Sequence, residues 1–402
     1  MSNLFLEANA PNRGPERRFR GNLWGVTAIK PTPDCWIRPT RIREGIKSVA
    51  LGAIIVVGAK NEVFAPAETV LPANDPAPLG GPLACFEVLG RSLVERIIER
   101  FVRIEVDVIS VLVEAETSFQ VPQLRGSFGN VSFQVVDDAE SAIEQKLREY
   151  SINGIQRSFV HCAEAYTETD LLDLFYFHRE ARQPATRACD HEGALALWVV
   201  DCAMPAQLDV RKVLGEAGRN GASYFVRGYV HRMADPRDLR EIATHMLQGH
   251  FQEGASGKEI RPGVWIDEGA RVHRRARIVG PAYIGCRSKV RADTLVTRCS
   301  SVERDCCVDY GTVIENSSLL PNTQIGIWLD VCHAIANGNK LFSLGRNVGI
   351  EISDPSVMRS TAPILSRNAE VSDRNEPRMS ADFEHEMLTQ RTWQLGANLI
   401  RE

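Results

Sequence analysis

The sequence predicts an α/β domain with a doubly wound mixed sheet, followed by a parallel β-helix. Residues 50–250 alternate apolar strands with amphipathic helices, which is the pattern of a mainly parallel sheet covered by helices. From Ile260 onward an aliphatic residue recurs at every sixth position. Neither the 3.6-residue period of a helix nor the two-residue period of a strand produces such a repeat.

The six-residue repeat predicts a coil made of short strands. In each repeat a strand points one aliphatic side chain inward, a tight turn follows, and a small residue four positions later lets the corner close. Three repeats make one coil, so the aliphatic side chains of successive coils form a column. Ile284 is expected to be wholly buried in it. The repeat is expected to slip after Leu320. Its aliphatic positions are Ile260, Ile266, Val272, Ile278, Ile284, Val290, Val296, Val302, Val308, Ile314 and Leu320.

The elements of the α/β domain follow from hydrophobic patterning. Residues 49–57 are apolar almost throughout, as in a strand that is buried on both faces. Further strands are expected at 106–113, 131–136, 157–162, 194–200 and 223–226. Amphipathic helices are expected at 90–102, 139–150, 167–182, 209–217 and 236–247.

Four segments are therefore predicted. They are an N-terminal arm (1–47), the α/β domain (48–250), the β-helix (258–358) with an excursion at 337–339, and a flexible tail (359–402) with a short helix near 383–394.

Composition describes an ordinary soluble protein. The 402 residues are 44% hydrophobic and 24% charged, and the net charge of −4 gives no reason to expect nucleic acid as a partner. The ten cysteines include no CxxC pair, so they are interpreted as reduced thiols. The N-terminal residues are polar and have no apolar signal-peptide core, and no apolar run is long enough for a membrane span. We expect a cytoplasmic protein without a membrane span.

Four motifs carry a family resemblance. Residues 53–66 are similar to the strand and loop GGxGTRLxP, and 82–91 are similar to PKPLLPVLGxP. Glu164 with 169–171 and 177–179 is similar to NGD…DL…FH, and 228–236 are similar to GYWxDIGTP. With these motifs and the β-helix, residues 50–350 resemble the sugar-1-phosphate nucleotidyltransferases, such as mannose-1-phosphate guanylyltransferases. The resemblance implies a left-handed coil, a sugar-nucleotide ligand, Mg²⁺ and a place in nucleotide-sugar and polysaccharide biosynthesis.

The charged residues of these motifs are replaced. Asn61 stands at a loop glycine, Val63 at the phosphate-binding arginine and Leu83 at the lysine of the second motif. Of the two metal-binding aspartates, one position holds Glu164 and the other Arg232, which would repel Mg²⁺. One lost oxyanion donor alone costs about 10²–10³ in rate. The resemblance therefore implies a catalytically degenerate protein that regulates or scaffolds an active homologue; the alternative is an active transferase with a remodelled site.

The remaining candidate site residues are few. Gly58, Lys60 and Asn61 are a weak nucleotide- or phosphate-binding candidate. Glu164 and Asp201 follow predicted strands, where α/β sheets place ligands, so they could hold a metal or a sugar hydroxyl, or cap turns instead.

A third alternative is an acyltransferase, which needs a histidine base between coils. His273 and His333 are the histidines available for it.

Charge is segregated along the predicted β-helix. Residues 271–298 hold eight lysines and arginines against one acid, whereas 303–315 hold four acids against one arginine. This is either a solvated face or a complementary contact between subunits. Two antiparallel copies would set opposite signs against each other, so we expect a homodimer, or a larger closed assembly, that salt weakens.

Overall fold

A computed structural model describes residues 50–58, 79, 81–115, 129–203, 210–217, 223–251 and 253–362. The predicted N-terminal arm, Lys60, Asn61, Val63 and the predicted helix near 383–394 lie outside these residues.

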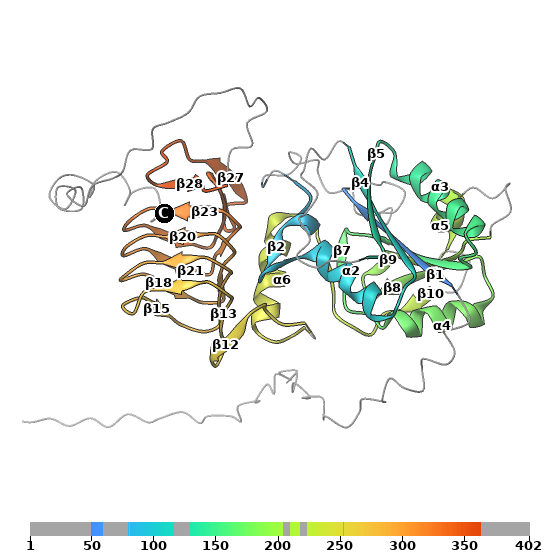
Figure 1. Ribbon diagram of the computed structural model, residues 1–402, viewed down its shortest axis with the longest axis horizontal. Helices are drawn as coiled ribbons and strands as arrows, with labels where there is room; N and C mark the ends of the chain where they lie inside the picture. Colours follow the sequence, from blue (N-terminus) through green and yellow to red (C-terminus); the bar gives the residue numbers. More distant parts are fainter. Residues whose placement is uncertain are drawn as a thin grey trace, which may run out of the picture. The chain divides into compact units, whose positions relative to one another are not determined.

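The α/β part is built on a seven-stranded mixed sheet with the order β10-β8-β9-β6-β1-β4-β5 (Figure 1). Strand β9 pairs antiparallel with both of its neighbours, and every other neighbouring pair is parallel. The mixed α/β class is thus confirmed. The strands are β1 (Leu51–Val57), β4 (Val108–Glu114), β5 (Val131–Val136), β6 (Arg157–Cys162), β8 (Ala185–Asp190), β9 (Gly193–Asp201) and β10 (Ser223–Phe225).

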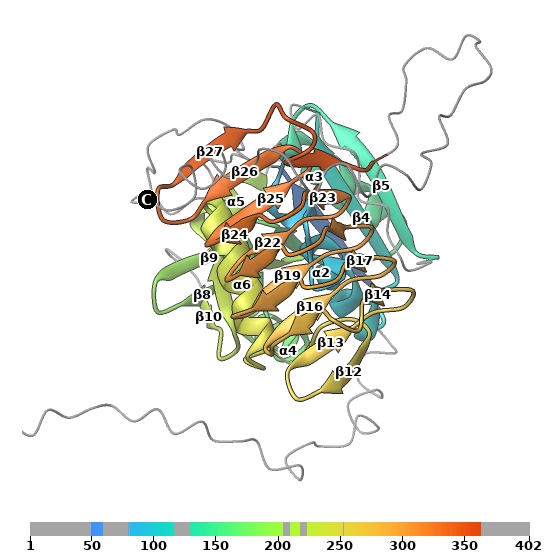
Figure 2. The same cartoon turned by 90° about the vertical axis from the view of Figure 1, so that its left-hand side faces the viewer.

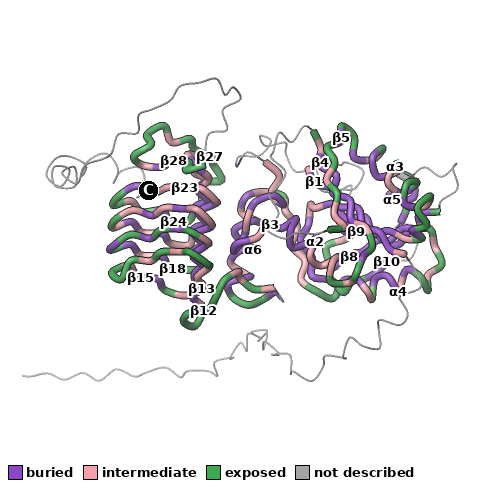
Figure 3. Tube along the Cα trace, in the orientation of Figure 1, coloured by how far each residue is buried: buried purple, intermediate pink, exposed green. Residues whose placement is uncertain are grey.

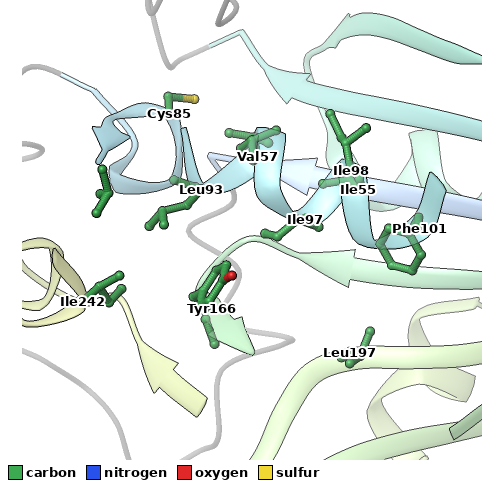
Figure 4. Packing of buried hydrophobic residues seen from close by; sticks show 14 of the residues in the cluster. Ile55, Val57, Cys85, Leu93, Ile97, Ile98, Phe101, Tyr166, Leu197 and Ile242 are labelled. Carbon is green, nitrogen blue, oxygen red and sulfur yellow. The ribbon is translucent and has the colours of Figure 1, made fainter. Parts of the chain in front are cut away.

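Helices cover both faces of this sheet. Ile54 and Val56 of β1 belong to one apolar cluster with α3 (Ala139–Ile152) and α5 (Val210–Glu216). Ile55 and Val57 belong to another cluster with α2 (Leu93–Arg103), α4 (Leu171–Ala181) and α6 (Pro236–Leu247). Figure 4 shows side chains of the second cluster, including Phe101 of α2, Tyr166 and Ile242 of α6. Strand β1 is therefore buried on both faces, as its apolar sequence predicts.

Some predicted elements were wrong at their ends. Residues 165–167 form the short strand β7 (Ala165–Thr167), antiparallel to β11 (Val230–Arg232), and not the start of a helix. Helix α4 begins only after Asp170, because its carboxylate accepts the backbone N–H groups of Leu172 and Asp173. Helix α2 likewise begins after Ser92, beyond the hairpin of β2 (Glu87–Val88) and β3 (Arg91–Ser92). Strand β8 was not predicted.

Residues 258–360, called the strand stack below, form three sheets of short, mostly parallel strands. The chain passes through the three sheets in turn, and the parallel partner of Val272 is Val290, 18 residues later. Figure 2 shows the strands lying over one another in successive coils. This arrangement is consistent with the predicted β-helix.

The bounds of these strands are as follows. The first sheet holds β12 (Lys258–Arg261), β13 (Val264–Ile266), β16 (Ala282–Ile284), β19 (Ser300–Val302), β22 (Ser318–Leu319), β25 (Ala334–Asn337), β26 (Lys340–Ser343) and β27 (Val348–Glu351). The second holds β14 (Arg271–Val272), β17 (Lys289–Val290), β20 (Cys307–Val308), β23 (Thr323–Ile325) and β28 (Met358–Ser360). The third holds β15 (Arg277–Ile278), β18 (Leu295–Thr297), β21 (Val313–Glu315) and β24 (Asp330–Cys332).

The predicted aliphatic column is present from Ile278 to Ile314, and its members are buried (Figure 3). It fails at both ends. Ile260 is 48% exposed because β12 turns back antiparallel against β13. The slip comes one repeat earlier than predicted, since Val302 pairs with Leu319 and not with Leu320. Leu320 instead joins the cluster of the α/β part.

The small corner residues have a second role that spacing did not predict. The Ser288 hydroxyl donates to the carbonyl of Glu303 and accepts the N–H of Cys306 in the next coil. Ser317 repeats this pattern with Val331 and Ala334. Each corner hydroxyl therefore satisfies backbone groups that the turn leaves without a ladder partner.

Charges on the outer surface pair between successive coils of one chain. Arg287 contacts Asp305 at 2.6 Å and Arg298 contacts Glu315 at 2.7 Å. Arg275 pairs with Asp293, and Arg291 lies 3.8 Å from Asp309. Four of the eight basic residues of 271–298 thus pair with acids of the same chain, and the homodimer stays a prediction.

One face of the strand stack packs against the α/β part. Tyr283, Ile335 and Phe342 of the first sheet share an apolar cluster with α2 and α6. The Arg240 side chain of α6 donates to the carbonyl of Cys299 at 2.8 Å. A flat face that sequence reasoning left open for another subunit is therefore occupied by the chain itself.

Four further expectations can be compared with the structure. Strand β28 includes residues 359 and 360, so the predicted tail begins too early. The excursion at 337–339 is the turn between β25 and β26. Each of the nine cysteines in the described part of the chain is a free thiol. None of the helices formed by the described residues is long and apolar enough to cross a membrane.

Candidate functional site

The carboxyl ends of β1, β4 and β6 meet at one edge of the sheet, where α/β proteins bind ligands. Gly58 follows β1 with φ at 99°, a conformation that glycine adopts readily. Glu114 ends β4, and Glu164 follows β6. Of the weak phosphate-binding candidate, only Gly58 lies within the described residues.

The two glutamates lie near a common neighbour, the Cys162 thiol. Burial raises the pKa of Cys162, and the charges of Glu164 and Glu114 raise it further, while Arg187 opposes them. The backbone carbonyl of Glu164 accepts the N–H of Met233, which joins this edge to the segment after β11. Sequence reasoning missed Glu114, although a carboxylate at the end of an apolar strand was the available signal.

Arg232 ends β11 and is held by acids of the β8–β9 turn. Its Nη1 and Nη2 atoms each lie 2.8 Å from a carboxylate oxygen of Asp190, and Nη1 lies 2.7 Å from Glu192. Burial alone would raise the pKa of Asp190, but the hydrogen bonds and charge of Arg232 hold it below its usual value. The position that resembles a metal-binding aspartate therefore holds an arginine, and its guanidinium is paired with Asp190 and Glu192.

Asp201 lies at the opposite edge of the sheet from Glu164. Strand β9 runs antiparallel to β6, so Asp201 pairs with Arg157 at the beginning of β6. Its carboxylate lies 2.9 Å from Arg157 and 3.5 Å from the buried ring of His178. Although burial would raise the pKa of Asp201, these two partners lower it. The structure does not bring Glu164 and Asp201 together, and Asp201 joins two strands and a helix.

The two histidines of the acyltransferase alternative lie apart. Both are exposed: His273 follows β14 of the second sheet, and His333 follows β24 of the third sheet, several coils away. The Nδ1 atom of His333 contacts the Asn316 side chain at 2.7 Å, and that of His273 accepts the N–H of Arg275. They thus belong to different sheets and to different coils of the stack.

Leu83 lies in a single turn of 3₁₀ helix, η3 (Leu83–Cys85), and packs against the apolar cluster of α2. The residue that stands at a lysine of the family motif thus contributes to the core.

Glu303 was counted as a surface charge from the sequence, but its exposed fraction is 1%. It lies where β19 meets the β2–β3 hairpin, and its two carboxylate oxygens accept the N–H groups of Leu89 and Gly90 at 2.9 and 2.8 Å. The sequence contained one indication that Glu303 lies on a covered face. The neighbouring outward positions of the first sheet, which lie side by side, hold the uncharged residues Trp265, Tyr283 and Ser301.

Replacing Arg232 by methionine is expected to cost about 1–3 kcal/mol of unfolding free energy, because Asp190 keeps a side chain only 4% exposed and loses its counter-charge. Urea unfolding measures it. Arg148→Met is the matched control, since Arg148 pairs with Glu144 on the open surface of α3 and should cost about 0.5 kcal/mol or less. Equal costs for the two variants would contradict the assigned role of Arg232.

Comparison with known proteins is limited to a distant structural similarity. No protein-family model and no curated protein matches the chain. Among solved structures, a Bacillus anthracis protein assigned as a glucose-1-phosphate thymidylyltransferase and crystallised with sucrose matches 48% of this chain and 93% of its own. The identity is 12% and the TM-score is 0.35. This similarity is too distant to transfer a substrate or a site residue.

Proposed function

We propose that this chain is a nucleotidyltransferase-like protein of nucleotide-sugar and polysaccharide metabolism that has lost the transferase reaction. We also propose that its strand stack is a left-handed parallel β-helix. The chain would act as a regulatory or scaffolding subunit that binds a sugar nucleotide or an active homologue. The observation that supports the loss is the ion pair of Arg232 with Asp190.

The chemistry explains why this ion pair matters. Nucleotidyl transfer builds negative charge on phosphoryl oxygens, which enzymes stabilise with cations and Mg²⁺ held by carboxylates. Here Arg232 occupies the position of one carboxylate, and withdrawing it would leave the buried Asp190 without its partner. Leu83, packed on the core, replaces a second charge of the motif.

We expect no Mg²⁺-dependent release of pyrophosphate from nucleoside triphosphates and hexose-1-phosphates. A coupled pyrophosphate assay checks this. Glu164→Ala serves as the inactive control, because it removes the carboxylate at the other position that resembles a metal-binding aspartate. Turnover on the order of 1 s⁻¹, ordinary for an enzyme, that disappears in Glu164→Ala would contradict the proposal. Sugar-nucleotide binding by calorimetry, without turnover, is the outcome that supports it.

The alternative of an active, remodelled site has one specific observation in its favour. Glu114 and Glu164 both lie at the ligand-binding edge, and the charges of both raise the pKa of the Cys162 thiol, so these two carboxylates are candidates for holding a metal without the Arg232 position. If turnover is found, its loss in both Glu114→Ala and Glu164→Ala would identify that pair as the metal site. Acyl transfer gains no comparable support, because His273 and His333 are separate.

A further inference from the structure

A second group of polar side chains lies where β11 faces α6. Successive strand residues point to opposite sides, so His231 points away from the Arg232–Asp190 ion pair. Its Nε2 atom lies 3.1 Å from Glu241 Oε2 of α6. One ligand atom each from His231, Asp238 and Glu241 lies within 4.8 Å of the others.

The start of helix α6 positions the two carboxylates. Asp235 caps the helix, and Asp238, at its third position, accepts the N–H groups of Ala234 and Asp235 through Oδ2 at 2.7 and 2.8 Å. This fixes the Asp238 side chain and leaves Oδ1 for another partner. Glu241 follows three residues later, which puts it on the same face of the helix as Asp238.

The two ring nitrogens of His231 have different neighbours. Nδ1 lies 2.8 Å from the backbone carbonyl oxygen of Arg232, which can only accept, so a hydrogen on Nδ1 satisfies this contact. That tautomer leaves the Nε2 lone pair directed at the Glu241 carboxylate, 3.1 Å away. A positive species can join these two acceptors, and it is either a proton or a metal ion.

We propose that His231, Asp238 and Glu241 bind a divalent transition-metal ion of the zinc class. Two ligands of a tetrahedral zinc ion lie about 3.3 Å apart for bonds of about 2.0 Å, close to the observed separation of His231 and Glu241. The hydrogen bond from Nδ1 to a backbone carbonyl is the partner that orients most metal-bound histidines. An imidazole with two carboxylates suits zinc better than magnesium.

Such an ion would be held by three protein ligands, which leaves a fourth position for water or a ligand group. It would also join β11 to α6, the helix whose Arg240 contacts the strand stack at Cys299. The proposal does not depend on the loss of transferase activity, because none of its ligands belongs to the edge formed by Glu114 and Glu164.

Zinc binding to the metal-stripped full chain tests this proposal by calorimetry. We expect one ion per chain, and affinity reduced about tenfold or more in His231→Gln and Glu241→Gln. His250→Gln is the matched control for an exposed histidine just beyond α6, and Glu216→Gln the control for an exposed glutamate. Both controls should bind as the unaltered protein does. Zinc should raise Tm in the unaltered chain and not in His231→Gln.

Each result bears on the proposal. An unchanged affinity in His231→Gln and Glu241→Gln would overturn it, as would an equal loss in His250→Gln, which would indicate chelation by scattered surface histidines. Should His231→Gln fail to fold without metal, Glu241→Gln decides, because the Glu241 side chain is 61% exposed and tolerates replacement. Absence of zinc binding together with a doubly protonated His231 by NMR would assign the positive species as a proton and refute the metal site.

Discussion

Ile284→Asp is expected to abolish soluble folding of the chain. Ile284 is fully buried, with Ile266 and Val302 beside it in the first sheet of the strand stack. A carboxylate there would have no counter-ion or donor, which costs several kcal/mol even after it is protonated. That cost is comparable with the total stability of about 5–15 kcal/mol of a typical domain. Soluble yield and thermal unfolding of the purified protein measure the effect.

Ile260→Asp is the matched control for this substitution. Ile260 belongs to the same six-residue repeat in the sequence, but its side chain is largely exposed. We expect normal expression and little change in Tm. Soluble Ile284→Asp protein with an unchanged Tm would contradict the column, whereas equal failure of both variants would mean that Ile260 is also buried in solution.

Glu303→Gln is expected to destabilise the chain most at about pH 5. At this pH the Glu303 side chain is a neutral acid, since its pKa is raised to about 8, and each of its oxygens still faces one buried N–H group of the β2–β3 hairpin that it can accept. A glutamine offers one acceptor and one donor, so one N–H group would face another donor. An unsatisfied buried group costs about 1–3 kcal/mol. Gly90 has little room to move toward Tyr283 and Ser256, because a Cβ atom at this position would collide with both of them.

The pH dependence of this effect has a defined sign. Burial raises the pKa of Glu303 to about 8, the charge of Glu87 raises it further, and the two N–H groups oppose the shift. The folded state thus holds the proton more tightly than the unfolded state. The contribution of Glu303 to stability is complete below about pH 4.5 and is lost as pH rises to about 8, with a slope of up to about 1.4 kcal/mol per pH unit.

Urea unfolding at several pH values separates the cost of the unsatisfied N–H group from the pH-dependent contribution of Glu303 to stability. The stability difference between the unaltered chain and Glu303→Gln should shrink, and can reverse, between pH 5 and pH 8. Glu268→Gln, at an exposed position of the same stack, should run parallel to the unaltered chain at every pH. A constant difference for Glu303→Gln across this range would show that the buried carboxylate has an ordinary pKa.

The strand stack was largely predictable because its repeat is local. Each aliphatic position contacts the equivalent position of the next coil, so spacing alone indicates burial from Ile278 to Ile314. The slip was not predictable, because Leu319 and Leu320 are both aliphatic and only pairing with Val302 distinguishes them. The ion pairs could have been predicted: Arg287 and Asp305 are separated by one 18-residue coil.

The candidate site was harder to predict, since it depends on strand direction. Asp201 does lie at the end of a strand, as expected, but that strand is the antiparallel β9, so its carboxyl end lies at the opposite edge of the sheet from Glu164. The His231 group joins β11 to a helix and depends on which side of a three-residue strand each side chain faces. Hydrophobic patterning does not determine either property.

At the slip before Leu319, the regular repeat of the strand stack conflicts with the packing of Leu320 on the α/β part. The coil from Val302 to Leu319 is one residue shorter than the 18-residue coils before it. In a full coil of the present sequence Leu320 would pair with Val302 and point into the aliphatic column, so it would leave the cluster shared with α2 and α6. The short coil is therefore an attachment point, and a design that restored the regular register would gain periodicity while weakening the contact between the strand stack and the α/β part.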